Sequence, residues 1–192
     1  MKKIFKFAAL AALILPLVVA CKKNGQNEPT SPENPNSYET MQDWLDYWST
    51  PNETDEVALT AENMVGIWEI VGKVEETTTG ELNTISIPTV NNCKNFEYLH
   101  LKPDFAFIRY FFYDKSGGGA EELVTEKEEG TWNVSGKELN FIISNDTSTN
   151  TIQLLDKDRL VVTYPIDAWS GNGTKSTCHA IYKRIESLPE MK

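Results

Sequence analysis

Apolar and polar residues alternate with a period of two along most of this 192-residue chain, from about residue 66 to residue 185. Turn-forming residues divide the alternation into short segments, and almost no stretch between them is long enough for a helix. The segments predict nine strands, over residues 66–75, 81–90, 95–101, 105–113, 122–134, 138–144, 151–155, 159–165 and 177–185. We therefore expect an all-β fold.

The turns between these segments indicate how the strands pair. Tight hairpins are predicted at residues 102–104, 135–137 and 156–158. Consecutive hairpins make antiparallel neighbours, and eight or nine such strands leave bare edges unless the sheet closes. The pattern thus predicts an up-and-down antiparallel meander of eight or nine strands that closes into a barrel over residues 59–187. Longer loops then meet at the opposite end of the barrel, at residues 114–121, 145–150 and 166–176.

A helical period precedes the strands, in the region 37–58. Its apolar residues fall at i, i+3, i+4 and i+7 and are Met41, Trp44, Leu45 and Trp48. They predict a short amphipathic helix over residues 38–49, capped by Ser37. Packing of this stripe on the domain behind it is favoured over a membrane or partner-binding role. Residues 60–64 predict one further helical turn.

The chain opens on a short apolar run. Lysines at positions 2, 3 and 6 precede thirteen mostly apolar residues, 7–19. This is typical of a secretory signal and is too short to span a membrane, which takes about 20 apolar residues. Val18-Val19-Ala20-Cys21 resembles the lipobox of bacterial lipoproteins, which implies that residues 1–20 are removed and that Cys21 carries the lipid. Pro16 and Ala20 disfavour the alternative, an uncleaved anchor helix.

The residues after Cys21 bear on location. Lys22 stands where an aspartate would resemble an inner-membrane retention signal, so the outer membrane is favoured. The first acid is Glu28, whereas surface-exported lipoproteins of Bacteroides-type bacteria carry acids directly after the cysteine, so a periplasm-facing position is favoured. Residues 21–36 contain three prolines among Asn, Gln, Ser and Glu and are expected to form a lipidated, flexible tether, and residues 188–192 a short tail.

The net charge limits the possible binding partners, and the cysteine content indicates a disulfide. Loss of residues 1–20 removes three lysines and no acid, and takes the formal net charge from −10 to −13. Such a surface repels phosphate backbones, so nucleic acid is excluded as a partner. With Cys21 assigned to lipid, Cys93 and Cys178 remain. An oxidising compartment favours a disulfide between them over two separately buried thiols. Nothing indicates the oligomeric state.

Four short motifs resemble those of one family. They are Gly66-Ile67-Trp68, Gly130-Thr131-Trp132, Leu139-Asn140-Phe141 and Tyr182-Lys183-Arg184. The first resembles the Gly-x-Trp signature of lipocalins, and together with the lipobox the set is similar to the lipocalin-like lipoproteins of Bacteroides-type bacteria, over residues 60–186. The resemblance implies a lipocalin or calycin-like barrel, in which Trp68 packs at one end under Arg184 or Lys183 and Gly66 serves a structural role.

The resemblance and the loop pattern disagree about the open end. Strict alternation of strand direction places the start of the first strand at the end with the long loops. Lipocalins open at the end opposite that start. Either one strand is miscounted or the mouth lies away from the long loops.

Candidate binding residues follow from one strand. Arg109 stands within an aromatic row with Phe107 and Phe111, which also includes Phe105 and Tyr113. If this face points inward, Arg109 can pair with a carboxylate or phosphate of a ligand; if outward, it is a surface arginine stacked on aromatic rings. Further candidates are Tyr98 and His100 on the preceding strand, and Trp169. Trp169 could be a lid residue or a contact tip, but folding back on the barrel is favoured over both.

Catalytic signatures are missing from the sequence. It holds two histidines, His100 and His179, with no nucleophile elbow and no paired histidines at metal-ligand spacing. We expect neither an enzyme nor a cofactor-dependent protein. The leading expectation is a membrane-anchored envelope protein that binds a small, largely apolar ligand in its barrel. The alternative is a filled barrel that contacts an envelope protein or glycan.

Overall fold

The computed structural model describes residues 37–51, 57–86, 96–114, 123–168 and 174–188. All of them lie in one compact unit, Ser31–Lys192. The expectations for residues 1–36, including Cys21, and those for Cys93 and Trp169 lie outside the described residues.

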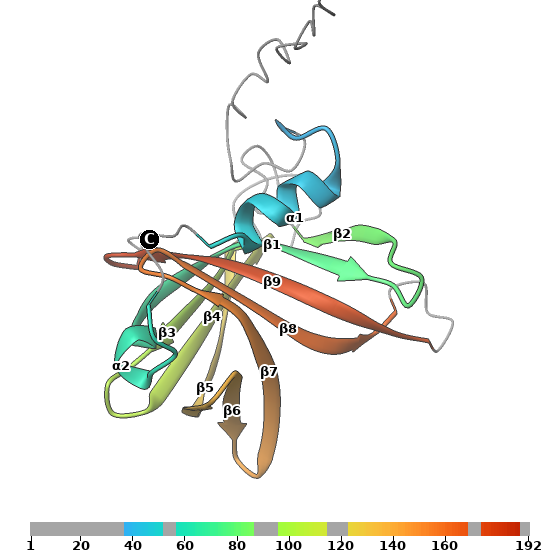
Figure 1. Ribbon diagram of the computed structural model, residues 1–192. Coiled ribbons are helices and arrows are strands. Elements are labelled where there is room, and N and C mark those ends of the chain that lie inside the picture. The colour runs from blue at the N-terminus through green and yellow to red at the C-terminus, as the bar shows by residue number, and fades with distance from the viewer. Residues whose placement is uncertain (1–36, 52–56, 87–95, 115–122, 169–173, 189–192) are drawn as a thin grey trace, which may run out of the picture. The chain divides into compact units, whose positions relative to one another are not determined.

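The described part of the chain is all-β apart from two short helices, as the sequence predicts. Its strands are β1 Gly66–Glu76, β2 Leu82–Ser86, β3 Phe96–Leu101, β4 Ala106–Asp114, β5 Leu123–Ser135, β6 Glu138–Ile143, β7 Asp146–Leu155, β8 Arg159–Asp167 and β9 Lys175–Ile185. From β3 to β9 each strand pairs antiparallel with the next, and β1 pairs with both β3 and β9. Eight described strands therefore close into a barrel, with β2 as an addition (Figure 1).

The added strand explains the disagreement about the open end. β3 pairs with the first half of β1, at residues 66–69, and β2 pairs with its second half, at residues 73–76. Both partners are antiparallel to β1, so β2 and β3 run in the same direction. Strict alternation of direction from the first strand is therefore wrong. The start of β1 lies at the tight-turn end, where Arg184 Nε donates to the Lys157 carbonyl and Nη1 to the Val65 carbonyl, both at 2.7 Å.

One predicted loop is a strand. Residues 146–150 extend β7, and a two-residue turn at Ser144-Asn145 joins it to β6. Ser144 takes a positive φ of 58°, which allows the chain to reverse within two residues. The segment 145–150 predicts a loop because its residues are all polar. They tolerate a strand because most of this part of β7 is exposed to solvent.

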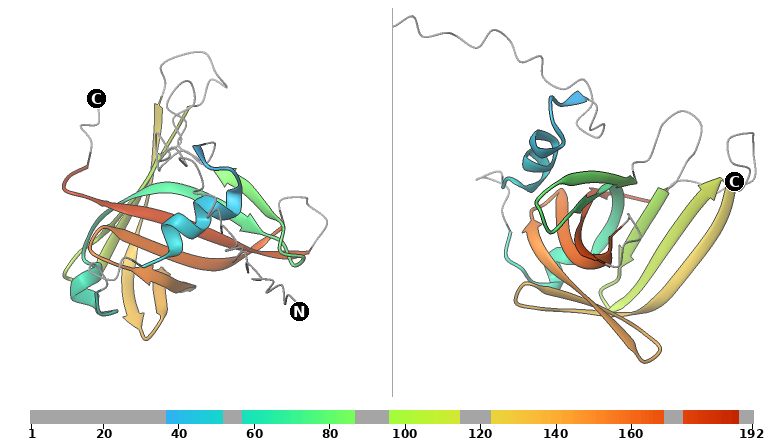
Figure 2. Two further views of the ribbon diagram at one scale, coloured as in Figure 1. Left: turned by 45° about the horizontal axis from the view of Figure 1, so that its top comes forward. Right: turned by 90° about the vertical axis from the view of Figure 1, so that its right-hand side faces the viewer.

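The amphipathic helix packs against the outside of the barrel. Helix α1 spans Met41–Ser49 and begins later than predicted, because Thr40 and Asp43 form a reciprocal capping box that places the cap at Thr40 and not at Ser37. Its buried residues Trp44, Leu45 and Trp48 contact outward-facing residues of β1, β7, β8 and β9, namely Val71, Val74, Leu154, Val161 and Ile181. Figures 1 and 2 show α1 lying across these strands.

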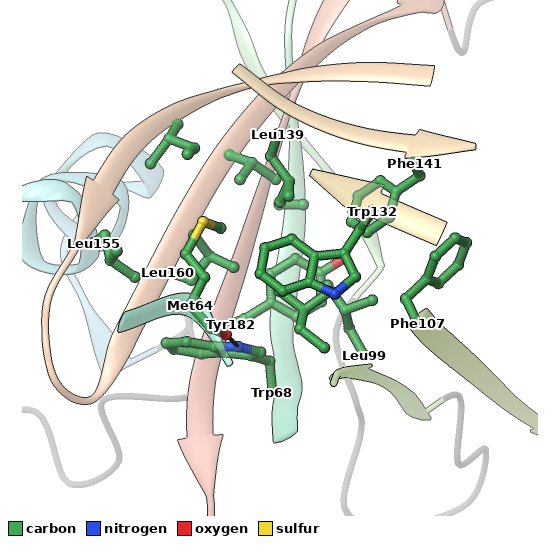
Figure 3. Packing of buried hydrophobic residues seen from close by; sticks show 14 of the residues in the cluster. Met64, Trp68, Leu99, Phe107, Trp132, Leu139, Phe141, Leu155, Leu160 and Tyr182 are labelled. Atoms are coloured by element: carbon green, nitrogen blue, oxygen red, sulfur yellow. Dashed lines mark hydrogen bonds between the residues drawn. The ribbon is translucent and has the colours of Figure 1, made fainter. Parts of the chain in front are cut away.

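A second cluster fills the tight-turn end of the barrel from within. Trp68, Trp132 and Met64, the last from the helical turn α2 (Ala61–Met64), are almost completely buried there (Figure 3). Gly130 permits this packing, because a Cβ at that position would stand 2.2 Å from the Ile142 carbonyl oxygen and 2.8 Å from the Phe107 ring. Since this end is filled, space for a ligand has to lie toward the other end.

Candidate functional site

The closed end of the barrel is organised around Trp68. Its Nε1 donates to the Met64 carbonyl at 2.9 Å, and the Arg184 guanidinium lies 4.1 Å from the centre of its ring. Arg184 also donates to the Asn63 carbonyl. Gly66 has a φ of 150°, and a Cβ there would meet Arg184 at 2.5 Å. Of the two basic residues that the resemblance offers, the structure thus places Arg184 on Trp68, whereas Lys183 pairs with Glu69 at 3.1 Å.

The barrel holds an internal pocket of about 510 Å³ toward the opposite end. It lies where β4 ends, β7 begins and β8 ends. Apolar side chains from four strands form much of its wall: Leu99, Phe111, Leu139, Phe141, Leu160 and Val162. The remaining wall is polar and includes Lys73, Glu97, Arg109, Ser148, Asn150, Tyr164 and Tyr182. The pocket therefore offers both an apolar surface and a small set of charged and hydroxyl groups.

Arg109 points into this pocket, together with the aromatic residues on its face of β4. Phe107 is buried in the internal cluster, and Phe111 lines the pocket. The Arg109 guanidinium lies 4.9 Å from the Phe141 ring centre and 6.0 Å from the Phe107 and Phe111 ring centres. Of the two orientations open from the sequence, the inward one is observed. Phe105 is not part of the row, because it stands in the turn before β4 with a φ of 61° and is exposed.

Glu97 is the centre of the polar wall. Its Oε2 accepts from Lys73 Nζ at 2.5 Å, its Oε1 accepts from the Tyr182 hydroxyl at 2.8 Å, and Arg109 Nε lies 3.4 Å away. Burial by itself would raise the pKa of this carboxyl, but the charges of Lys73 and Arg109 outweigh burial and lower it. Glu97 is thus an ionised carboxylate held inside the barrel by two cations.

Tyr164 and Cys178 form the neighbouring part of the interior. The Tyr164 hydroxyl and the Cys178 thiol hydrogen-bond each other. Burial raises the pKa of the Cys178 thiol, so it is a poor nucleophile at neutral pH. Cys178 is a free, buried thiol in this structure. Because Cys93 lies outside the described residues, the disulfide between them stays a prediction.

Tyr98 and His100 face away from the pocket, which corrects their proposed role. On β3 the inward residues are Glu97, Leu99 and Leu101, so the residues between them point outward. The Tyr98 hydroxyl donates to Glu69 Oε1 on the outer face at 3.1 Å. Burial, with a contribution from nearby Lys102, lowers the pKa of His100. Neither residue lines the pocket.

Lys73 and Glu97 are the site residues that sequence reasoning missed. Regular alternation from Trp68 and Ile70 on β1 would place Lys73 outside. The pairing of β1 with β9 shifts between Ile70 and Gly72, and this bulge turns Lys73 inward. The inward position of Glu97 could have been predicted, because period-two alternation places it on the same face of the strand as the buried Leu99 and Leu101. An acid on an apolar strand face is typical of a buried ion pair.

A larger and more open pocket, of about 650 Å³, lies outside the barrel beside the end of α1. It is lined largely by groups that hold the helix in place. Arg159 pairs with Asp156 at 2.7 Å and donates to the carbonyls of Tyr47 and Thr50 at 3.0 Å each. These contacts account for its polar residues structurally. The internal pocket is the better candidate, because its cations face an apolar chamber.

The described residues form neither a metal-binding cluster nor a membrane-spanning helix. No three His, Cys, Asp or Glu side chains in the described ranges gather closely enough to hold a metal ion. Within the same part of the chain, neither helix has the length and hydropathy needed to cross a membrane.

Comparison with known proteins agrees with the barrel. The family model for the lipocalin-like domain matches residues 64–162, which run from the end of α2 into β8. No curated protein matches the chain. The match covers half of the sequence and includes Trp68, Arg109 and Glu97. With its eight-stranded antiparallel barrel closed by the pairing of β1 with β9, the chain belongs to the lipocalin-like family.

Proposed function

We propose that this protein is a lipid-anchored protein of the bacterial cell envelope that binds a small, largely apolar molecule inside its barrel. The observation that carries the proposal is the internal pocket of about 510 Å³. Ligand sites in proteins occupy roughly 300–1,000 Å³ and combine apolar walls with a few placed polar groups. A barrel filled by its own side chains would have no such volume.

The anchoring part of the proposal rests on the sequence. The lipobox-like Val18-Val19-Ala20-Cys21 supports lipidation of Cys21, and the absence of an aspartate after it supports the outer membrane. The late first acid, Glu28, supports a periplasm-facing position. A coiled tether over residues 21–36 would reach roughly 20 Å, which would keep the barrel close to the membrane surface.

Binding is favoured over catalysis by the state of the polar groups in the pocket. Glu97 is engaged by Lys73, Tyr182 and Arg109, so it is not placed as a general base. Tyr182 has a pKa well above its usual value because it is buried beside Glu97. We therefore propose that the barrel has no enzymatic activity.

The alternative of an interaction module finds less support. It predicts a contiguous patch of exposed aromatic side chains. Among the described residues, the exposed large hydrophobic side chains are Tyr47, Phe105 and Ile143, which come from α1, a tight turn and the end of β6. Trp44 and Trp48 are buried against the barrel and offer no surface to a partner.

Native mass spectrometry of the full chain, extracted from its own cells, tests the proposal. We expect a small molecule that stays with the folded protein and leaves on denaturation, and a modification mass on the N-terminal peptide that begins at Cys21. Ser148→Trp, which fills the pocket from β7, should abolish the co-purified mass. Thr131→Trp, on the exposed outer face of β5, is the matched control and should retain it. Wild-type protein without a co-purified small molecule, or the same amount of it in both variants, would contradict ligand binding in the barrel.

A further inference from the structure

The charged groups that line the pocket do not balance. Among the described lining residues, Lys73 and Arg109 are cationic and Glu97 is the one carboxylate. Glu97 lies between them, 2.5 Å from Lys73 Nζ and 3.4 Å from Arg109 Nε. Within the lining, one carboxylate therefore faces two cations. A further acid, Glu128, pairs with Arg109 at 3.1 Å from outside the lining.

Arg109 has hydrogen-bonding capacity that the protein does not use. Its Nη1 donates to Glu128 at 3.1 Å, but its Nε is buried and has no hydrogen-bond partner. The rings of Phe111 and Phe141 flank the guanidinium and hold its orientation. A buried donor without an acceptor is costly, and a charged acceptor supplies the strongest compensation. A carboxylate on a ligand would provide one.

The surroundings limit how much negative charge the pocket accepts. Glu128 stands beside Arg109 with its side chain 43 % exposed, and Glu75 is buried two residues along β1 from Lys73. Neither lines the pocket, yet both act on it electrostatically. One negative charge on the ligand can be held between the two cations of the lining, whereas a second is opposed by Glu97 and these two acids.

We propose that the pocket selects ligands whose polar end is a monoanion, of which a carboxylate is the simplest case, bound between Arg109 and Lys73. Glu97 is the residue that sets this selectivity, because it neutralises one of the two cations. The inference rests on the proposed function, since it assigns the polar end of the molecule held in the barrel. The apolar body of that ligand lies against Phe111, Phe141 and the leucines of the wall.

Calorimetric titration of the full chain in lipid nanodiscs tests the selectivity, with empty nanodiscs as the blank. The four probes share an eight-carbon chain and differ in the polar end: octanoate, 1-octanol, octylammonium and octyl phosphate. At pH 8 the phosphate is a dianion, because its second pKa is near 6. We expect octanoate to bind about tenfold more tightly than 1-octanol, from the charged hydrogen bond to Arg109. Octyl phosphate should bind more weakly than octanoate, and octylammonium most weakly.

Two variants assign the selectivity to Glu97. Glu97→Gln keeps the size of the side chain and one acceptor oxygen but removes one negative charge, and should raise the affinity for octyl phosphate relative to octanoate by about tenfold. Glu129→Gln removes the same charge from the exposed outer face of β5 and should leave that ratio unchanged.

The outcomes separate the two proposals. Equal affinities of wild-type protein for octanoate and 1-octanol, or tighter binding of octyl phosphate or octylammonium, would overturn the monoanion preference and leave the binding function standing. An unchanged ratio in Glu97→Gln would overturn the role of Glu97. No binding of any of the four probes would contradict the binding function itself.

Discussion

Gly130 offers a stringent test of the closed barrel, because its missing side chain lets β5 and β6 approach each other beside Phe107. A Cβ at this position would stand 2.2 Å from the Ile142 carbonyl oxygen, far inside the distance of about 3.2 Å at which such atoms can rest. The clash is with backbone, so it cannot be relieved by a change of rotamer. The sheet would have to open by roughly 1 Å, or Phe107 would have to leave its place in the core.

The expected cost of Gly130→Ala is about 3 kcal/mol, at the upper end of the range for overpacked cores. Reduced freedom of the unfolded chain would offset well under 1 kcal/mol of it. For a domain of this size, each kcal/mol lowers Tm by about 2–4 °C, so thermal unfolding followed by circular dichroism should show a fall of about 6–12 °C.

Gly136→Ala is the matched control. Gly136 lies in the turn after β5 with a φ of 58°, and a Cβ there meets nothing within 4 Å. Strain of the left-handed backbone should then cost only about 1–2 kcal/mol. If Gly130→Ala proves no more destabilising than Gly136→Ala, the close approach of β5 to β6 is wrong.

Three further predictions concern the Arg159–Asp156 pair, Glu97 and the cysteines. Arg159→Met leaves the buried Asp156 without its cation and the end of α1 without its donor, so we expect the free energy of unfolding to fall by about 3 kcal/mol. Amide hydrogen exchange should become faster in α1 than in the barrel, whereas Lys157→Met, at an exposed position, should be nearly neutral. Uniform exchange would contradict the role of Arg159 in holding the helix. The pKa of Glu97 is lowered in the folded state, so its ionised form should stabilise the protein fully above the unfolded pKa of about 4.3 and lose this effect as pH falls through the lower folded value. Urea unfolding at pH 3 to 7 should therefore show a stability difference between wild type and Glu97→Gln that shrinks only below about pH 4.3. A difference that already shrinks near pH 6 would refute the lowered pKa. In denatured protein from the cell envelope, the predicted Cys93–Cys178 disulfide should block alkylation of both residues until a reductant is added, and two alkylated thiols without reductant would refute it.

The fold was accessible from the sequence because turn residues and period-two alternation are local signals. Nine strands were predicted, and the tight turns around Pro103, Gly136 and Asp158 were found where the structure has them. The direction of β2 was not accessible, because whether a short strand crosses the barrel or stays beside β1 depends on long-range pairing. The first residues of β7 are polar and mostly exposed, so no apolar alternation identifies them as part of a strand.

The site was only partly accessible for a related reason. The aromatic row around Arg109 stands out in the sequence, and alternation alone limits it to two orientations. Choosing between them requires the register of β4 against its neighbours. The inward direction of Lys73 depends on the bulge between Ile70 and Gly72, for which Gly72 is only a weak local signal. That of Glu97 depends on recognising an acid as part of an inward face. The groups that determine charge in the pocket are thus the least visible in the sequence.

The most direct test of the central claim is a crystal structure of the protein purified with its native content. The account predicts a closed eight-stranded barrel in which an ordered molecule lies against Phe111 and Phe141, with its polar end at Arg109. A barrel whose interior is filled by its own side chains, or an Arg109 that points to solvent, would contradict it.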